Sequence, residues 1–457
     1  MIKNLVFFID MNWSQLLSNK RLGQEAMHLE RKDDRTEFKR DYDRLIFSAP
    51  FRRLQNKTQV FPLPGSVFVH NRLTHSLEVA SVGRSLGDDV ARMLLDRHPE
   101  LADTHLSEIG SIVSAACLAH DMGNPPFGHS GERAICSYFR EGDGLQYKPQ
   151  MSDAEWADVT HFDGNANAFR LLTHTFKGRR PGGFVMTYST LASIVKYPWP
   201  AIQCTKKPKF GFFQQEQEAY ERIAAELGIP LVAQESSPAG GGWRGLRHPL
   251  VYLVEAADDI CYEIMDIEDA HKLRLLTTEE TKELLLGFIP AERHERAKEV
   301  FDHVTDVNEQ IVYLRSSAIG TLEHECVRTF VEHEQEILDG TFTGSLVDHI
   351  SPDVRAAYER CQQVSVRKIY RSKDVLDIEL AGYRIISQLI DLFTTAAMHP
   401  EREYSKLLLA RVSSQYEVDA DTPYARIMAV LDYISGMTDV FALDLYRKIN
   451  GESLPMI

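Results

Sequence analysis

Ionisable side chains interrupt three otherwise apolar segments of the chain. His75 lies in the segment Arg-Leu-Thr-His-Ser, the pair His120-Asp121 follows the apolar run 109–119, and Asp258 interrupts a third apolar run. An ionised carboxylate inside a protein is costly unless it is paired or binds a metal. Each residue taken singly is typical of a hydrogen-bonded core position, but two histidines and two carboxylates together suit a divalent cation with coordination positions left for water and substrate. The sequence therefore predicts a metal site formed by His75, His120, Asp121 and Asp258.

The loop after His120-Asp121 contains a candidate for proton transfer. Its sequence over 123–132, GNPPFGHSGE, is rigid and irregular, which is typical of connections that carry function on a helical scaffold. If a helix starts at His129, Glu132 lies one turn further along and its carboxylate orients the imidazole. A histidine held in this way beside a metal site is suited to general acid–base catalysis. We predict His129 and Glu132 as a catalytic pair, with a hydrophilic turn that contains a chance histidine as the alternative.

Helices are expected to position these groups. Apolar residues recur at three-to-four spacing over 77–95, and 109–119 is almost uniformly apolar, which is typical of a buried helix. Gly123 and the prolines after it cannot continue that second helix. Further helices are predicted at 250–267, 376–395 and 424–446, breaks at 180–183 and in the glycine-rich loop 236–245, and an irregular segment or short hairpin at 197–213. The predicted fold class is all-α.

Composition restricts the classes of function. The 457 residues carry a net charge of −15, which argues against a surface that grips nucleic acid throughout, although basic clusters at 44–57 and 196–209 are compatible with a local anion pocket. No stretch approaches the roughly 18 uninterrupted apolar residues of a membrane span, and the run Leu5–Ile9 is too short for a signal peptide. A membrane partner is therefore not expected. Six scattered cysteines without a C-x-x-C pair predict a reduced, cytoplasmic protein.

Seven longer motifs occur in order along the chain. They are FRRLQNKTQVF at 51–61, RLTHSLEV at 72–79, HDMGNPPFGHSGE at 120–132, HFDGNAN at 161–167, EAADDICY at 255–262, GYRIIS at 382–387 and YISGMTD at 433–439. In this order they resemble the bacterial deoxyguanosine triphosphate triphosphohydrolases (dGTPases) of the HD superfamily, over about residues 13–450. The resemblance implies an HD-domain helical core at 41–275, a lead-in at 1–40, and a helical C-terminal region at 276–457 that contributes to the substrate pocket and to oligomer contacts.

The resemblance also implies a role for individual residues. It makes His75, His120, Asp121 and Asp258 the metal ligands and His129 with Glu132 the catalytic pair. It places Arg72 at the α-phosphate, Lys196 and Tyr197 at the phosphates, and Glu379 at the guanine edge. Gln59, Tyr262 and Asp266 would contact the deoxyribose, with the Tyr262 ring excluding a 2′-hydroxyl. Tyr262 and Asp266 follow Asp258 by one and two helical turns, so one helix face carries all three.

The activity implied is hydrolysis of dGTP or other deoxynucleoside triphosphates (dNTPs) to deoxynucleoside and tripolyphosphate, by water that attacks the α-phosphorus. The cofactor implied is a divalent metal ion. The candidates are manganese, magnesium and cobalt, with iron, nickel or zinc as alternatives. The resemblance further implies a homo-oligomer, a hexamer, and a second site for a dNTP or single-stranded DNA effector. Two alternatives are a different HD phosphohydrolase, which would not require Gln59, Tyr262 and Asp266, and a catalytically silent sensor, which would have no chemical reason to keep His129 and Glu132.

Overall fold

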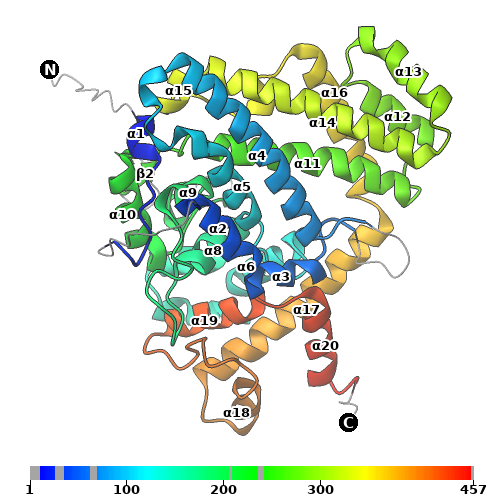
Figure 1. The fold of residues 1–457 in the computed structure, drawn as a ribbon. Coiled ribbons are helices and arrows are strands. Elements are labelled where there is room, and N and C mark those ends of the chain that lie inside the picture. The colour runs from blue at the N-terminus through cyan, green and yellow to red at the C-terminus, as the bar shows by residue number, and fades with distance from the viewer. Residues whose placement is uncertain (1–10, 26–34, 62–68, 205–207, 235–240, 454–457) are drawn as a thin grey trace, which may run out of the picture.

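The computed structural model describes residues 11–25, 35–61, 69–204, 208–234 and 241–453. These residues form a predominantly helical body (Figure 1), which confirms the predicted all-α class. The α-helices are α1 Trp13–Leu16, α2 Glu37–Ile46, α3 Ala49–Arg53, α4 Arg72–Arg97, α5 Ile109–Ala119, α6 His129–Glu141, α7 Asp153–Thr160, α8 Gly164–Thr173, α9 Tyr188–Ser193, α10 Gln217–Leu227, α11 Leu250–Lys272, α12 Thr278–Leu286, α13 His294–His303, α14 Val307–Glu332, α15 Glu334–Leu338, α16 Pro352–Val364, α17 Lys373–Met398, α18 Glu403–Leu409, α19 Pro423–Ser435 and α20 Asp439–Ile449. Short 3-10 turns occupy Leu54–Asn56, Pro99–Leu101, His105–Glu108, Asp143–Gln150, Ala201–Gln203, Gln214–Glu216, Ala291–Arg293 and Leu346–Asp348, and a π-helical turn occupies Ser365–Ile369.

The centre of the fold is the pairing of α4 with α5, and α11 packs against both. Glycines allow the close approach of α4 and α5, because a Cβ atom on Gly87 would lie only 2.6 Å from the Cα of Gly110. Each helix brings one histidine to the same end of this core, His75 from α4 and His120 from the last turn of α5. The packing of small residues therefore places the two imidazoles side by side, with ring centroids 5.5 Å apart.

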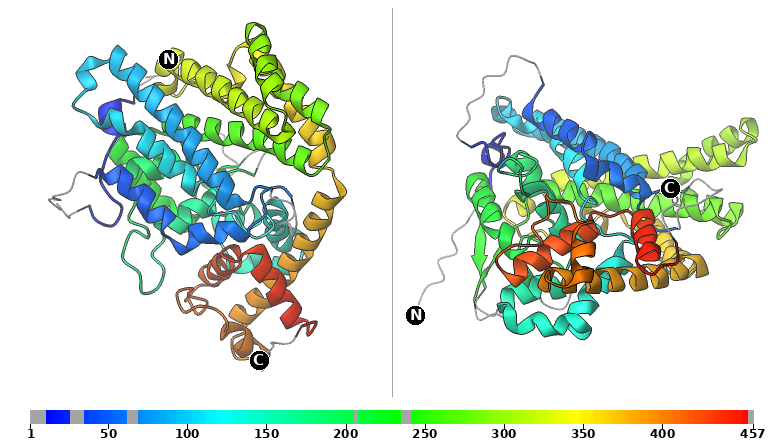
Figure 2. Two further views of the ribbon diagram at one scale, coloured as in Figure 1. Left: turned by 45° about the vertical axis from the view of Figure 1, so that its right-hand side comes forward. Right: turned by 90° about the horizontal axis from the view of Figure 1, so that it is seen from below.

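The C-terminal helices form a second layer below this core. In Figure 1, α17 runs diagonally along the lower right, and α18, α19 and α20 gather at the lower end of the molecule. The views in Figure 2 show α17 leading from the helices around α14 towards that lower group. Two clusters of buried apolar residues correspond to this arrangement, one around α4, α5, α11 and α14 and one around α6, α17 and α19.

Most predicted helices occur close to their predicted positions. The helix predicted at 109–119 is α5, and those predicted at 250–267 and 376–395 are α11 and α17, each longer by a few residues. The helix predicted at 77–95 begins earlier, at Arg72, because Asn71 and Thr74 form a capping box that satisfies the free N–H groups of its first turn. His75 consequently lies inside the first turn of α4 rather than ahead of the helix.

The single helix predicted at 424–446 is wrong. The structure has two helices there, because α19 ends at Ser435 and the Thr438 side chain caps a new helix, α20, by accepting a hydrogen bond from the Phe441 backbone N–H. Apolar periodicity continues across the break, so the pattern alone did not reveal it. The break changes the direction of the chain and places Asp439 in the first turn of α20.

The non-helical predictions are partly confirmed. Residues 181–183 form a turn, and the described parts of the segment 197–213, which are 197–204 and 208–213, are irregular with a 3-10 turn at Ala201–Gln203. The predicted loop 236–245 extends too far, since Trp243–Gly245 is strand β2, paired antiparallel with β1, Leu231–Ala233, in the register Leu231↔Gly245. Residues 236–240 of that loop, Lys206 and Lys207 of the basic cluster, and the run Leu5–Ile9 lie outside the described residues. No described helix has the length and apolar character of a membrane span.

Arg170 of α8 connects the core to the C-terminal layer through a buried ion network. Its Nε and Nη2 atoms donate to the Asp432 carboxylate of α19 at 2.8 and 2.7 Å, and its Nη1 donates to Glu216 at 2.6 Å. Removing one partner of a buried pair leaves an uncompensated charge, so we expect Arg170→Met to lower the free energy of unfolding by about 3–5 kcal/mol. Chemical denaturation tests this expectation. The control Arg92→Met removes an exposed pair with Asp89 and should change little; equal effects of the two variants would contradict the assigned role of Arg170.

Candidate active site and metal centre

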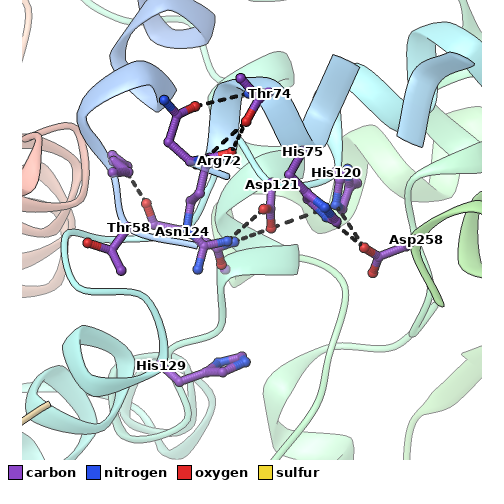
Figure 3. Close-up of polar contacts among 12 residues, drawn as sticks. Thr58, Arg72, Thr74, His75, His120, Asp121, Asn124, His129 and Asp258 are labelled. Carbon is purple, nitrogen blue, oxygen red and sulfur yellow. Dashed lines mark hydrogen bonds and ion pairs between the residues drawn. The ribbon is translucent and has the colours of Figure 1, made fainter. Parts of the chain in front are cut away.

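Four polar side chains from three helices converge at the lower end of the core. The Nε2 atom of His75 lies 3.0 Å from Oδ1 of Asp258 on α11, and Nε2 of His120 lies 3.4 Å from the same oxygen. Potential ligand atoms of His75, His120 and Asp121 lie within 4.8 Å of one another. Figure 3 shows the two imidazoles facing Asp258 on one side and Asp121 on the other. The structure thus brings together all four residues predicted as metal ligands.

The donor atoms in this cluster fit a divalent cation. The Nδ1 atom of His120 pairs with the Cys117 carbonyl at 2.6 Å, which orients the ring, while its buried Nε2 has no hydrogen-bond partner and points at the carboxylates. Burial disfavours charge on this imidazole, yet Asp121 and Asp258 raise the pKa of His120 to about 9. The cluster therefore attracts positive charge and offers nitrogen and oxygen ligands of the kind that transition-metal ions and magnesium accept. The Cys117 carbonyl orients His120, and Arg72 and Asn124 orient Asp121, as is usual for groups that surround metal ligands.

Arg72 occupies the side of the cluster that faces the loop 123–128. Its Nη1 atom donates to Oδ2 of Asp121 at 2.6 Å, and Asn124 donates to the other oxygen of that carboxylate. The guanidinium needs space next to Gly128, where a Cβ atom would lie 2.7 Å from Arg72 Nη2. Gly128 also has φ +55°, a conformation that glycine adopts without strain. The glycine therefore allows both the turn of the chain and the close approach of the arginine.

His129 is the first residue of α6 and stands apart from the metal cluster in Figure 3. Its Nδ1 lies 2.7 Å from Oε2 of Glu132, and its side chain is 70% exposed, whereas Glu132 is buried. The other oxygen of Glu132 accepts the Gly164 backbone N–H at 2.7 Å. Burial would raise the pKa of Glu132, but the hydrogen bond from His129 keeps it below its ordinary value. The ionised carboxylate orients the ring and leaves Nε2 available to an incoming group.

A cavity of about 470 Å³ is lined both by residues of the His/Asp cluster and by His129. This volume lies within the range of about 300–1,000 Å³ that is usual for small-molecule sites. Its walls include most residues predicted from the sequence to contact substrate or metal, namely Gln59, Arg72, His120, Asp121, His129, Glu132, Lys196, Tyr197, Asp258, Tyr262 and Glu379. The cavity also contacts residues that were not predicted, among them Lys209, Asn165 and Tyr370.

One wall of the cavity is cationic. Lys196 lies 2.9 Å from Glu255, which holds the pKa of the lysine above its ordinary value although burial opposes the charge. Lys209 lies 2.6 Å from Asp163 and has a raised pKa, again against the effect of burial. Both lysines therefore carry positive charge over the physiological pH range. The basic cluster at 196–209 was the only sequence signal for Lys209.

Another part of the cavity lining is built from tyrosines. The Tyr262 ring lies 6.0 Å from the Tyr370 ring, centroid to centroid, and 6.4 Å from the His75 ring. Asp266 lies behind this wall rather than on it, where its carboxylate accepts the Tyr370 hydroxyl at 2.8 Å. Tyr370 follows the π-helical turn Ser365–Ile369, an irregularity that helical periodicity does not predict. Gln59 lines the same cavity, and its buried Oε1 atom has no hydrogen-bond partner among the residues that the structure describes.

Glu379 of α17 lies at the rim of the cavity. Its carboxylate pairs with Arg133 at 2.9 Å, and both side chains are about half exposed. Its backbone carbonyl accepts the Ser130 hydroxyl at 2.5 Å, which ties α17 to the start of α6. Glu379 therefore contributes to the cavity lining from α17, in the C-terminal layer.

The helical core and its His/Asp cluster define a class of protein. The profile of the HD domain matches residues 72–174, which contain His75, His120 and Asp121, and that of the phosphohydrolase-associated domain matches 349–448. The chain is an HD-domain phosphohydrolase, and enzymes with this domain are typically metal-dependent.

Comparison with known proteins gives the family. A deoxyguanosinetriphosphate triphosphohydrolase-like protein of Pseudomonas aeruginosa is 38% identical, covering 97% of this chain and 100% of its own length. A protein with the same description from Synechocystis is also 38% identical with the same coverage. The deoxyguanosinetriphosphate triphosphohydrolase of Yersinia enterocolitica is 29% identical over 90% of this chain and 93% of its own. The chain belongs to the deoxyguanosinetriphosphate triphosphohydrolase-like family.

Proposed function

We propose that this protein hydrolyses dGTP, and other deoxynucleoside triphosphates, to the deoxynucleoside and tripolyphosphate in a metal-dependent reaction. The observation that carries the proposal is the composition of one cavity. It combines a His/His/Asp/Asp cluster, a wall with two charged lysines and a wall with two tyrosines. Metal, oligophosphate and sugar each have a matching surface there. The names of the related proteins favour dGTP as the nucleotide.

The metal would be held by His75, His120, Asp121 and Asp258. A divalent cation bound there would supply Lewis-acid chemistry, which lowers the pKa of water and withdraws charge from phosphoryl oxygens. The protein's part is to fix these ligands. Asn124 and Arg72 each hold one oxygen of Asp121, and Cys117 orients the ring of His120.

Cationic side chains would bind the phosphates. Arg72 is held beside the cluster by Asp121, so it faces an α-phosphate placed there, while Lys196 and Lys209 extend the positive surface along the cavity. Charges fixed before the substrate arrives stabilise negative charge that develops on the phosphoryl oxygens in the transition state. Tyr197 packs beside Lys196, whose Nζ lies 5.9 Å from the ring centre, and so limits the directions that this lysine can take.

His129 would transfer the proton. Its Nδ1–H donates to the Glu132 carboxylate, so the opposite nitrogen, Nε2, is the atom that exchanges a proton with the substrate or water. The reaction breaks the bond between the α-phosphorus and the nucleoside 5′-oxygen, and this oxygen must receive a proton as it leaves. The exposed side of the His129 ring is the side open to the cavity.

The sugar would lie against the tyrosine wall. Tyr262 follows Asp258 by one helical turn, so a phosphate at the cluster brings the ribose beside its ring. The buried, unpartnered Oε1 of Gln59 is an acceptor for a sugar hydroxyl. The Tyr370 hydroxyl donates a hydrogen bond to the Asp266 carboxylate. Asp266 would therefore act on the sugar through Tyr370 or from a position beside it.

A matrix of metals and nucleotides tests the proposal. Metal-free protein is assayed with dGTP, dATP, dCTP, TTP and GTP, each with magnesium, manganese or cobalt. We expect no turnover without metal and turnover of dNTPs with at least one metal. Equal activity in the presence of a chelator, or turnover of GTP alone, would contradict the proposal.

Tyr262→Ala tests the source of sugar selection. Because the ring excludes a 2′-hydroxyl by its bulk, we expect the ratio of kcat/KM for dGTP over GTP to fall about tenfold, which corresponds to about 1.4 kcal/mol. Metal content should not change, since the phenol is not a proposed ligand. Tyr262→Phe keeps the ring and should keep the ratio. An unchanged ratio in Tyr262→Ala, with both substrates slowed equally, would make Tyr262 a packing residue.

A further inference from the structure

Two C-terminal sequence motifs, GYRIIS at 382–387 and YISGMTD at 433–439, have no role in the chemistry above. Both lie in the second helical layer, the first within α17 and the second across the junction of α19 and α20. In space they approach the same point, the turn at Phe127 that immediately precedes His129. The last residue of the second motif, Asp439, makes the most direct contact with this turn.

The buried Asp439 carboxylate joins two backbone segments. Its Oδ1 accepts the Phe127 N–H at 2.9 Å, and its Oδ2 accepts the Thr58 N–H at 2.8 Å. Phe127 lies in the loop between Asp121 and His129, and Thr58 is the neighbour of Gln59. Figure 3 shows Thr58 and Asn124 on the same side of the site as Arg72, away from Asp258. One carboxylate thus ties the loop that leads to His129 to the segment that carries Gln59.

The loop needs such support because its conformation is unfavourable. Phe127 has φ +62° and Gly128 has φ +55°, and a side chain with a Cβ atom rarely adopts the left-handed region. A strained residue keeps its conformation only when its surroundings fix it. His129 follows this turn directly, so the turn determines the direction in which α6 and the imidazole point.

Two further contacts hold the same loop. Lys57 is fully buried and donates to the Asn124 carbonyl at 2.6 Å and to the Ser435 carbonyl at 2.8 Å. From the other side, Gly382 packs against Phe127, and a Cβ atom there would lie 2.5 Å from the Phe127 Cβ. The loop is therefore fixed between α17 and the α19–α20 junction. Among these contacts, the carboxylate of Asp439 alone binds the backbone of the strained residue itself.

We propose that Asp439 is a positioning residue for proton transfer: it holds the Phe127 turn so that His129 faces the metal cluster. This inference rests on the proposed function of His129. Asp439 does not itself line the cavity; its carboxylate contacts the backbone N–H groups of Phe127 and Thr58, which do, and we infer that it acts through the backbone of residue 127. The C-terminal layer thereby contributes to catalysis from a residue more than 300 positions downstream of the loop.

The variant Asp439→Asn tests the proposal, since it keeps the shape but can accept only one of the two N–H groups. Displacement of a reacting group by about 1 Å can cost up to about a hundredfold in rate, so we expect kcat for dGTP to fall about 10- to 100-fold. Bound metal should stay at the wild-type level. Loss of the metal in this variant would make Asp439 a support of the metal site and would contradict the proposal.

A double-mutant cycle with His129→Ala separates positioning from general weakening of the fold. If Asp439 acts through His129, adding Asp439→Asn to His129→Ala should change kcat by less than about twofold. Losses that multiply in the double variant would overturn the proposal. The matched control is Asp444→Asn in the same helix, where an exposed carboxylate pairs with Lys448 and does not contact the loop; its kcat should equal that of the wild type.

Hydrogen–deuterium exchange makes the test independent of activity. Asp439→Asn should speed exchange in peptides that cover 122–130 and 54–60, and Asp444→Asn should not. If the wild type does not hydrolyse dGTP, the proposed function fails, while the exchange measurement still decides whether Asp439 holds the loop. Should Asp439→Asn not fold, Gly382→Ala displaces Phe127 from the opposite side and should lower kcat with the metal retained. The proposal is overturned if exchange is unchanged in Asp439→Asn, or if kcat is unchanged in Gly382→Ala.

Discussion

His120→Ala and Asp121→Asn are expected to contain no stoichiometric metal and to show no detectable hydrolysis of dGTP. His120 supplies a buried nitrogen that lies 3.4 Å from Asp258, and Asp121 supplies one of the two carboxylates of the cluster. Removal of one ligand leaves three of the four proposed donors, which we expect to be too few to hold a labile divalent ion. Elemental analysis of purified protein, together with activity at saturating metal, measures both effects.

The choice of asparagine at position 121 matters for the interpretation. Asp121 also pairs with the buried Arg72, so alanine would leave an uncompensated guanidinium and could unfold the site for a separate reason. Asparagine keeps the shape and one acceptor for Arg72. Full metal occupancy in either variant, with an unchanged thermal midpoint, would remove that residue from the metal site.

His129→Ala is expected to retain the metal but to lose about 10²–10⁴-fold in kcat, the usual cost of removing a general acid or base. The imidazole lies outside the cluster in space and, in the part of the chain that the structure describes, pairs with Glu132, so we expect metal binding not to depend on it. Glu132→Gln should produce a smaller loss in the same direction, because it weakens the orientation of the ring without removing it. Near-normal kcat in His129→Ala would show that the proton reaches the leaving oxygen by another route.

The His/Asp cluster that is proposed to bind the metal was the most predictable part of the site. Buried carboxylates and histidines in apolar segments are costly without a partner or a metal, so burial alone predicts His75, His120 and Asp258 as members of a site. The i, i+3 spacing of His129 and Glu132 likewise predicts their hydrogen bond once α6 begins at residue 129. The signal for His129 and Glu132 is local in the sequence, and the signal for the His/Asp cluster depends on burial alone.

The remaining features depend on irregular backbone or on contacts between distant segments. Tyr370 reaches the cavity because a π-helical turn precedes it, and the break between α19 and α20 interrupts a continuous apolar pattern. Asp439 lay inside the single helix predicted at 424–446 and was assigned no role, yet its carboxylate binds a loop more than 300 positions away. Hydrophobic periodicity carries no information about such pairings, because it reports which face of a helix is buried and not which segment covers it.

Analysis of the reaction products by ³¹P NMR tests the central claim most directly. Purified protein is incubated with dGTP and manganese or magnesium, and the phosphorus products are compared with standards while chromatography identifies the nucleoside. Cleavage at the α-phosphorus predicts deoxyguanosine and intact tripolyphosphate in equal amounts, with no pyrophosphate or orthophosphate. Formation of dGMP with pyrophosphate, formation of dGDP with orthophosphate, or recovery of unchanged dGTP under all metal conditions would contradict the account.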